Sequence, residues 1–490
     1  MQGQIRRVGV GLVIAFLAIF AQLNYVQIFA AESIANNNAN IRSLLREYSI
    51  KRGDIITADG VNIALSRSTD DNLEYLRTYP QGELYGHVTG YYSIVFGTRA
   101  LESSFNAQLL GEGGVISMQD IEDSFLGSGE QGDDVITTID SELQATARAA
   151  LGGQVGSVVA LDPRSGEVKA MWSNPSYDPT PLASHDPQEE RAYARSLNPR
   201  SADSPLVNGV TQKGYPPGST FKVVTAAAAL ESGRFTPSST FDDPVALDLP
   251  QTDNTLSNFT NTACAGGGQI DLFTALRISC DTTFATLGLE IPDELRATAE
   301  GFGFNDSIPF DVRVEPSTFP DIPDDSLPLR AFAGIGQGDV VATPLQMALV
   351  ASAIATGGDV PRPRLVSEVI DASGSIVERF SPESIGRAIS PETASQLTEM
   401  MVAVVEDGTG TNAQIPGVEI AGKTGTAQSA EGAAPHAWFI CFAPADDPQL
   451  AVAVVVENGG SIGAEATGGV VAAPIARAVL EKDRANSNEW

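Results

Sequence analysis

Positive charge is scarce in this 490-residue chain, which has 61 acidic residues against 30 lysines and arginines and a net charge of -31. A nucleic-acid-binding protein needs a basic face, so the composition argues against such a partner. It argues equally against broad adhesion to anionic lipid. With 42% hydrophobic and 19% charged residues, the chain is expected to be globular and long enough for about two or three domains.

Residues that bind metals are also few. The cysteines are Cys264, Cys280 and Cys441, and the histidines are His87, His185 and His436. Zinc sites need close pairs of such residues, and this spacing provides none. We therefore predict no metal site. The count of histidines alone leaves a Ser-His-Asp triad open.

One long segment lacks charge altogether, between Arg7 and Glu32. About 20 mostly apolar residues cross a bilayer, so residues 8–31 are predicted to be a membrane anchor. Arg6 and Arg7 precede it, which predicts a cytoplasmic tail at 1–7 and export of everything after the span. The alternative is a cleaved signal peptide ending near the small residues Ala30 and Ala31. No second span of this kind follows in the sequence.

Export permits disulfides, and Cys264 and Cys280 lie on either side of a triple-glycine turn and a short helical stretch. A bridge between them would restrain the unfolded chain by roughly 3 kcal/mol. Two buried free thiols are the alternative. Cys441 lies in an apolar strand pattern and is expected in the core.

The pattern along the chain predicts an α+β fold. Residues 32–132 are mixed and polar, whereas 135–151 reads as a strand followed by an amphipathic helix. Hairpins are predicted at 156–172 and 436–458, with a mostly helical region between them and a last helix at 468–485. The sheet is thus expected to form from both ends of one domain. Its antiparallel hairpins argue against a doubly wound parallel sheet.

The segment YPPGSTFKVVTAAAALE, residues 215–231, combines a turn, a serine, a lysine and a buried helix. Ser219 is expected at the start of the helix, where backbone N–H groups and the helix dipole favour developing negative charge. Lys222 lies three residues later, on the same face. A serine hydroxyl needs a base to become nucleophilic, and a lysine with a lowered pKa can be that base. The alternative is a capping serine beside a lysine that reaches out to solvent.

Two further motifs favour the catalytic interpretation. Ser279-Cys280-Asp281 follows a helical stretch, and Lys423-Thr424-Gly425 lies in a strand pattern before the second hairpin. The order S-x-x-K, S-x-[N/D], K-T-G is that of penicillin-binding proteins and serine β-lactamases.

With these motifs the chain resembles a class B penicillin-binding protein over nearly its whole length. Other segments with this resemblance are KRGDIITADG, LESSFNAQLLGEGG, NPSYDP, GIGQGDVVATPLQMA, AGKTGTAQ and HAWFICFAP. The paired cysteines around the second motif suggest the actinobacterial penicillin-binding protein A branch. The resemblance implies a small α+β pedestal at 32–132 and a transpeptidase domain at 133–490, with a five-stranded antiparallel sheet between helices. The pedestal is too short for the glycosyltransferase domain of class A members.

The resemblance also implies roles for the motif residues. Ser219 should attack the D-Ala-D-Ala carbonyl of a peptidoglycan stem peptide, with Lys222 as the general base. An amino group of a neighbouring stem peptide should then resolve the acyl-enzyme. Ser279 should relay a proton to the leaving group, and Lys423 should help to keep Lys222 neutral.

The third motif should bind substrate as well. Thr424 is expected to hydrogen-bond the terminal carboxylate, next to Gly425. The backbone N–H groups of Ser219 and Thr426 should form the oxyanion hole. No metal or cofactor is required. Asp281 stands where many members have asparagine, and its carboxylate would tend to keep Lys222 protonated.

The implied partners are stem peptides, β-lactams as covalent inhibitors, the cytoplasmic membrane through one helix, and other wall-synthesis proteins through the pedestal. The expected location is the cell membrane, single-pass, with the catalytic domain outside. A serine β-lactamase and a non-catalytic β-lactam-binding scaffold or sensor are the alternatives. The acceptor amine, and recruitment by division or by elongation, stay open.

Overall fold

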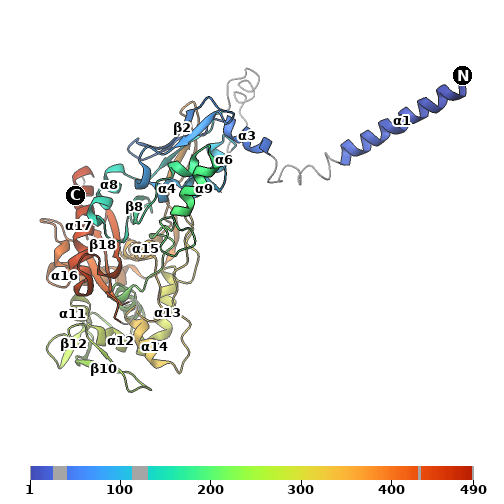
Figure 1. Ribbon diagram of the computed structural model, residues 1–490. Helices are drawn as coiled ribbons and strands as arrows, with labels where there is room; N and C mark the ends of the chain where they lie inside the picture. Colours follow the sequence, from blue (N-terminus) through green and yellow to red (C-terminus); the bar gives the residue numbers. More distant parts are fainter. Residues whose placement is uncertain (1, 26–40, 113–130, 429–431, 488–490) are drawn as a thin grey trace.

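The computed structural model describes residues 2–25, 41–112, 131–428 and 432–487. The first helix, α1 (Gln2–Tyr25), bears no buried side chain among those described (Figure 1). Within the described ranges, Arg6–Tyr25 is the one helical segment long and apolar enough to cross a membrane, with a mean hydropathy of 1.9. The predicted anchor extends to residue 31, and its last part, with Ala30 and Ala31, lies outside the described residues.

A five-stranded antiparallel sheet forms the centre of the larger module, in the order β17-β18-β19-β7-β8. Its strands are β7 (Gly156–Leu161), β8 (Val168–Asn174), β17 (Ala421–Ala427), β18 (His436–Ala443) and β19 (Leu450–Val456). Both predicted hairpins are present, so the sheet does form from the two ends of the domain. Every residue of β7, β18 and β19 is buried, which explains their continuous apolar sequences.

Helices cover both faces of this sheet. On one face, the helices α8 (Ser141–Leu151) and α17 (Gly468–Ser487) pack with Val158 and Cys441. On the other face, α15 (Pro344–Ala355) packs with Val159 and Ile440. Successive strand residues alternate between the two faces, as the pleat requires. Cys441 is a fully buried core residue, as predicted.

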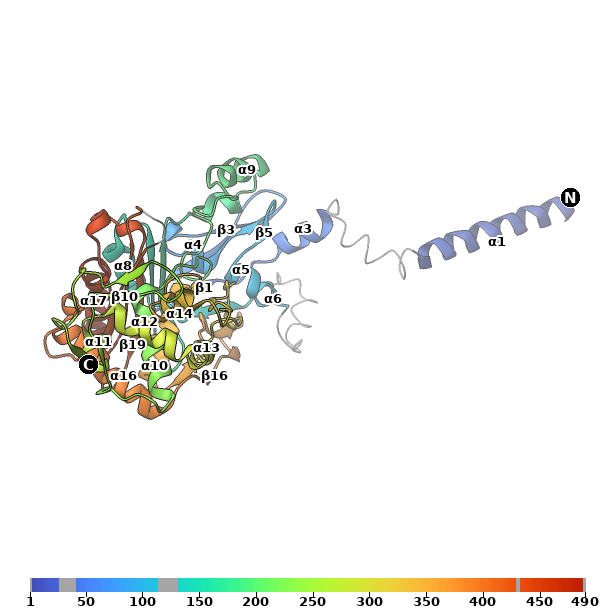
Figure 2. The ribbon, with the colours of Figure 1, turned by 90° about the horizontal axis from the view of Figure 1, so that it is seen from below.

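The middle of the chain is mostly helical, as predicted, with small strand pairs added. In Figure 1 most of these helices lie at the lower end of the molecule, away from α1, and Figure 2 shows them from that end. The helices are α10 (Lys222–Glu231), α11 (Leu272–Arg277), α12 (Asp281–Glu290), α13 (Pro292–Gly301), α14 (Leu327–Gly334) and α16 (Pro391–Glu406). The strand pairs are β9 (Thr240–Asp242) with β12 (Gln269–Asp271), β10 (Ala246–Asp248) with β11 (Thr255–Ser257), and β13 (Asp359–Pro361) with β16 (Ser384–Arg387).

A second sheet joins the membrane-proximal module, whose described residues are 41–112, to the larger module, whose described residues are 133–428 and 432–487. Its order is β15-β14-β6-β1-β2-β3, and only the β1–β6 pair is parallel. The strands are β1 (Ile55–Ile56), β2 (Asn62–Ser68), β3 (Tyr75–Thr78), β6 (Asp134–Thr137), β14 (Val366–Ile370) and β15 (Ile376–Arg379). Strands from both sides of the expected boundary at residues 132 and 133 therefore share one sheet.

Smaller elements complete the membrane-proximal module and the rim. They are α3 (Ile41–Ser49), α4 (Gly86–Thr89), β4 (Tyr92–Ser93), β5 (Gly97–Thr98), α5 (Leu101–Ser104), α6 (Asn106–Leu109) and α9 (Pro187–Ser196).

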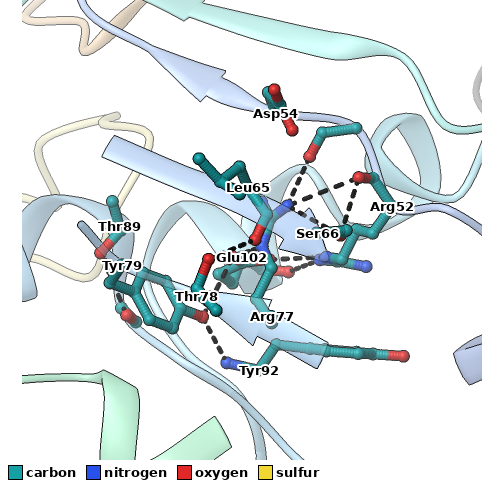
Figure 3. A network of polar contacts seen from close by, with 12 residues as sticks. Arg52, Asp54, Leu65, Ser66, Arg77, Thr78, Tyr79, Thr89, Tyr92 and Glu102 are labelled. Atoms are coloured by element: carbon teal, nitrogen blue, oxygen red, sulfur yellow. Dashed lines mark hydrogen bonds and ion pairs between the residues drawn. The ribbon is translucent and has the colours of Figure 1, made fainter. Parts of the chain in front are cut away.

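A buried ion network holds the membrane-proximal module together (Figure 3). Glu102, on α5, accepts hydrogen bonds from Arg52 Nε and Arg77 Nε, each at 2.6 Å, and from the Tyr79 hydroxyl at 3.1 Å. Burial alone would raise the pKa of Glu102, but the two guanidinium groups lower it on balance. The network therefore fixes α5 against β3 and the segment that precedes β1.

Candidate active site

Ser219 lies on a tight turn that packs against β17. The 3-10 helix η4 (Gly218–Phe221) contains it, and α10 begins directly afterwards at Lys222. Gly218 has a φ of +52°, and a Cβ there would lie 2.9 Å from Ala427 Cβ and 3.0 Å from Thr426 O. Only glycine fits this approach. Because a 3-10 helix has three residues per turn, Ser219 and Lys222 share a face.

Lys222 is fully buried, and its amino group has three acceptors. Nζ donates to Asp281 Oδ1 at 2.7 Å, to Ser279 O at 2.8 Å and to Ser279 Oγ at 3.3 Å. Burial lowers the pKa of Lys222, and the carboxylate of Asp281 opposes this lowering. Within the described residues, the Ser219 hydroxyl makes no hydrogen bond of its own.

Ser279 lies between the two buried lysines. Its hydroxyl is 2.8 Å from Lys423 Nζ and 3.3 Å from Lys222 Nζ. Its φ of +63° is unusual for a residue with a side chain, so the loop between α11 and α12 holds it in a strained conformation. This conformation was not predictable from the S-x-D pattern.

Lys423, on β17, is fully buried and makes no ion pair within the described parts of the chain. Nζ donates to Ser279 Oγ and, at 3.0 Å, to Thr424 O. Burial and, next, the charge of Lys222 lower its pKa well below the ordinary lysine value. A positive charge on Lys222 thus disfavours a positive charge on Lys423. Of the two, Lys222 alone has a carboxylate partner among the described residues.

The rest of the third motif runs along β17 beside the serine turn. A Cβ on Gly425 would lie 2.9 Å from Thr220 Cγ2 and 3.0 Å from Pro217 O, so the glycine permits the close contact with the turn. The Thr424 hydroxyl lies 2.6 Å from that of Thr409, a residue that the sequence analysis missed. Thr426 follows, half-buried, where the turn meets the strand.

The structure joins Cys264 and Cys280 in a disulfide, with the Cα atoms 5.7 Å apart, rather than leaving two free thiols. The bridge ties a loop to the second motif. In that loop the backbone N–H of Phe259 donates to Asp281 Oδ2 at 3.1 Å, and Asn258 Oδ1 accepts from Thr282 N at 3.0 Å. Neither partner had a signal in the sequence.

Asp243 was also missed, and its carboxylate accepts backbone N–H groups from Cys264, Ala265 and Gly267 at 2.7 to 2.9 Å. The ligand atoms of Asp243, Cys264 and Cys280 lie within 4.8 Å of one another, and they are the one such cluster within the described residues. Since both sulfurs are in the disulfide and the carboxylate is occupied, these atoms do not fit a metal ion.

Within the described residues no histidine side chain is hydrogen-bonded to a motif residue, although His436 pairs with Ala427 across β17 and β18. His87 contacts Pro205 O, His185 pairs with Asp71, and His436 accepts from Asn458 N. Within the described residues none is hydrogen-bonded to Ser219, so the basic groups that converge on this turn are lysines.

Two family models match the chain. The penicillin binding protein transpeptidase domain matches residues 156–481, and the penicillin binding protein A dimerisation domain matches residues 52–135.

Similar proteins of known sequence match nearly the whole chain. Peptidoglycan D,D-transpeptidase PbpA of Mycolicibacterium smegmatis is 40% identical, over 98% of this chain and 98% of its own length. The protein of the same name from Mycobacterium tuberculosis strain H37Rv is 38% identical, over 98% of this chain and 99% of its own length.

Solved structures are similar too. Penicillin-binding protein A from M. tuberculosis, as a ceftriaxone acyl-enzyme complex, has a TM-score of 0.84 and 38% identity, and covers 89% of this chain and 99% of its own. Its penicillin G acyl-enzyme complex has a TM-score of 0.82 at 38% identity, with coverage of 89% and 100%.

Proposed function

The chain belongs to the penicillin-binding protein family of peptidoglycan D,D-transpeptidases, and we propose how its residues carry out this reaction. The observation that carries the proposal is the Ser279 hydroxyl, which bridges the buried amino groups of Lys222 and Lys423 beside the Ser219 turn.

In the acylation step, neutral Lys222 takes the proton of Ser219 as Oγ attacks the carbonyl carbon of the D-Ala-D-Ala bond. All three donors of a protonated Lys222 have acceptors here, so the amine must lose a proton before it can act as a base. Its burial supports that loss, since a low-dielectric environment disfavours the ammonium form.

The tetrahedral intermediate then collapses, and the terminal D-Ala leaves with a proton. Ser279 has one O–H and two acceptor sites, so it can accept from one amine and donate to another group at the same time. We assign it the relay of the proton from Lys222 to the leaving amine. Lys423, on β17, takes part in this relay through its hydrogen bond to the Ser279 hydroxyl.

The strand and the serine turn bind the substrate. Thr424 is assigned to the terminal carboxylate, and Thr409 orients its hydroxyl through their 2.6 Å contact. The backbone N–H groups of Ser219 and Thr426 are assigned to the oxyanion, since preorganised donors stabilise charge that develops there. The close packing of Gly218 on Thr426 supports this pairing.

An amine of a second stem peptide then attacks the acyl carbon, so that an amide bond forms and Ser219 recovers its proton. Two alternatives differ at this step. A β-lactamase would hydrolyse a penicilloyl group rapidly with water, and a scaffold would form no acyl-enzyme. The relatives that match over 98% of this chain are named transpeptidases, and two similar solved structures are acyl-enzyme complexes, which supports the synthase.

We further propose that residues 8–31 anchor the protein, with 1–7 in the cytoplasm and the catalytic module outside. In this proposal 32–132 is the pedestal that contacts other wall-synthesis proteins, and 133–490 is the transpeptidase domain. The apolar character of Arg6–Tyr25 supports the anchor, and the two matched family segments support the division.

The test uses the full chain in detergent with a D-Ala-D-Ala stem pentapeptide and an amine-bearing acceptor peptide. We expect release of D-Ala with a cross-linked peptide of matching mass, and neither product with Ser219→Ala. Release of D-Ala by Ser219→Ala at the wild-type rate would contradict the assignment of the nucleophile. Fast destruction of benzylpenicillin without cross-linking would instead identify a hydrolase.

A further inference from the structure

A cleft of about 380 Å³ lies at the seam between the membrane-proximal module and the catalytic module. One wall is formed by residues 87, 91, 98–100, 103 and 104, and the other by residues 177, 206, 208, 211, 212, 312 and 313. The volume is in the range of small-ligand sites. It contains none of the residues assigned to the transpeptidase reaction.

Hydrogen bonds cross the seam at this cleft, three of them at 2.8 Å or less. His87 Nε2 donates to Pro205 O at 2.8 Å, Arg99 Nη2 donates to Leu206 O at 2.8 Å, and Ser104 Oγ donates to Asp311 O at 2.5 Å. The network around Glu102 fixes α5 from its other side, so the wall that carries Arg99 and Ser104 is rigidly held.

The charge of the cleft is opposite to that of the chain as a whole. Arg99 and Arg313 line it, and within the described residues no aspartate or glutamate does. Arg313 pairs with Glu315 at 2.5 Å, so its charge is offset. Arg99 has no ion pair within the described ranges, and only its Nη2 has acceptors, Leu206 O and Gln212 Oε1. Three of the five N–H donors of its guanidinium therefore have no acceptor among the described residues.

The surroundings of Arg99 favour an acceptor with negative charge. His87 is neutral, because burial lowers its pKa to about 4 and the charge of Arg99 adds to the lowering. The Ser103 and Thr98 hydroxyls line the cleft and make no hydrogen bond to described residues, so they remain available as donors. Thr211, fully buried in the opposite wall, also has a hydroxyl with no partner in the described structure. An uncompensated guanidinium with neighbouring hydroxyls is a typical arrangement for a carboxylate or a phosphate.

We propose that this cleft is an anion-binding site for a small carboxylate- or phosphate-bearing ligand, held by Arg99 together with Ser103 and Thr98. The site goes beyond the transpeptidase function. A ligand there bridges the two modules, since its acceptor atoms would bind the wall formed by residues 98–103 while it rests against residues 206–212.

The experiment uses the full chain in detergent, with inorganic phosphate and acetate as probes at constant ionic strength, so that general screening does not change. Phosphorus line broadening reports phosphate, and proton saturation transfer reports acetate. We compare wild type with Arg99→Gln and with Ser103→Asp, which adds a negative charge but leaves Arg99 and its seam contacts in place. The matched controls are Arg67→Gln and Ser68→Asp, both exposed on β2.

We expect saturable binding of at least one probe to wild type and to both controls, and at least tenfold weaker binding to both cleft variants. Phosphate alone would identify a phosphorylated ligand, acetate alone a carboxylate, and both together a site selective for charge only. Penicillin acylation should be unchanged in every variant, which shows that each is folded. Absence of saturable binding by either probe, or equal binding by the cleft variants and the controls, would overturn the proposal.

Discussion

The pair Lys222–Asp281 places a carboxylate 2.7 Å from the amine assigned as the base. The carboxylate favours the ammonium, whereas burial favours the neutral amine. Lys423 has no such carboxylate partner in the described parts of the chain, and the charge of Lys222 adds to the lowering of its pKa by burial. Acylation needs a neutral Lys222. We therefore expect the acylation rate to rise with pH as Lys222 loses its proton, at a pKa below the ordinary lysine value.

Asp281→Asn should retain acylation by benzylpenicillin, within about tenfold of wild type at neutral pH. Removal of the carboxylate removes the influence that raises the pKa of Lys222, so the acid limb of the pH–rate profile should move to lower pH. Rates of adduct formation by mass spectrometry between pH 5 and pH 9, with exposed Asp253→Asn as the control, measure this. Complete loss of acylation in Asp281→Asn alone would mean that the carboxylate has a specific chemical role.

The three motifs mark Ser219, Lys222, Ser279 and Lys423 as candidates by residue type and spacing, and the Ser279 hydroxyl lies between the two lysines. Their catalytic roles stay predictions. The left-handed backbone of Ser279, and the contact of Thr424 with Thr409 15 residues before it, are features of the folded chain. No local pattern specifies such contacts.

Among the elements, the short helix α5 depends on one buried carboxylate. Glu102 is fully buried between Arg52 and Arg77, and these pairs join α5 to β3 and to the segment that precedes β1. A buried pair contributes little net stability as a whole, but removal of one partner leaves the other charge unpaired.

Glu102→Gln should therefore lower the free energy of unfolding by about 3 kcal/mol or more. Urea denaturation of the full chain, compared with Glu399→Gln at an exposed position on α16, measures it. Equal midpoints for the two variants would refute the view that the network holds this module together.

His87, on α4, is hydrogen-bonded to Pro205 O in the segment that leads towards Ser219. Its protonation couples the stability of the fold to pH. Its folded-state pKa is about 4 against 6.5 in a free histidine, because burial disfavours the charged ring. Between these values the unfolded chain binds more protons, so stability rises with pH across the window and falls as pH drops from 6.5 to 4. The change amounts to at most about 3 kcal/mol.

His87→Gln should lack this contribution. Between pH 7 and pH 4 the free energy of unfolding of wild type should fall by up to about 3 kcal/mol more than that of His87→Gln. Denaturation curves at both pH values test the difference. Parallel losses in the two proteins would show that His87 is not buried in its neutral form.

Elements with strong local patterns were predictable, whereas their partners were not always so. The hairpins β7–β8 and β18–β19 follow from apolar runs on either side of turn residues, and α8 follows from its periodicity. The sheet that pairs β6 with both β1 and β14 was missed, since these strands are short and far apart in sequence. Pairing of that kind is decided by tertiary packing.

Taken as a whole, the molecule combines an acidic chain with one apolar N-terminal helix. Arginines at the start of the helix favour a cytoplasmic N-terminus. The acidic exterior offers no electrostatic attraction to anionic lipid, so membrane attachment should depend on the helix alone.

The full chain should therefore stay in the membrane pellet after alkaline carbonate extraction, and a chain without residues 1–31 should be released. Protease added outside intact spheroplasts should digest the catalytic module. Protection of that module from external protease would contradict the proposed orientation, and release of the full chain by carbonate would contradict the anchor.

The most direct test of the account is the mass of the full chain after brief incubation with benzylpenicillin, followed by peptide mapping of the adduct. We predict one penicilloyl group per chain, located on Ser219, stable over the time of the measurement and absent from Ser219→Ala. An adduct on another residue, an adduct that persists in Ser219→Ala, or no adduct with the penicillin left intact would contradict the assignment of Ser219 as the nucleophile of this transpeptidase.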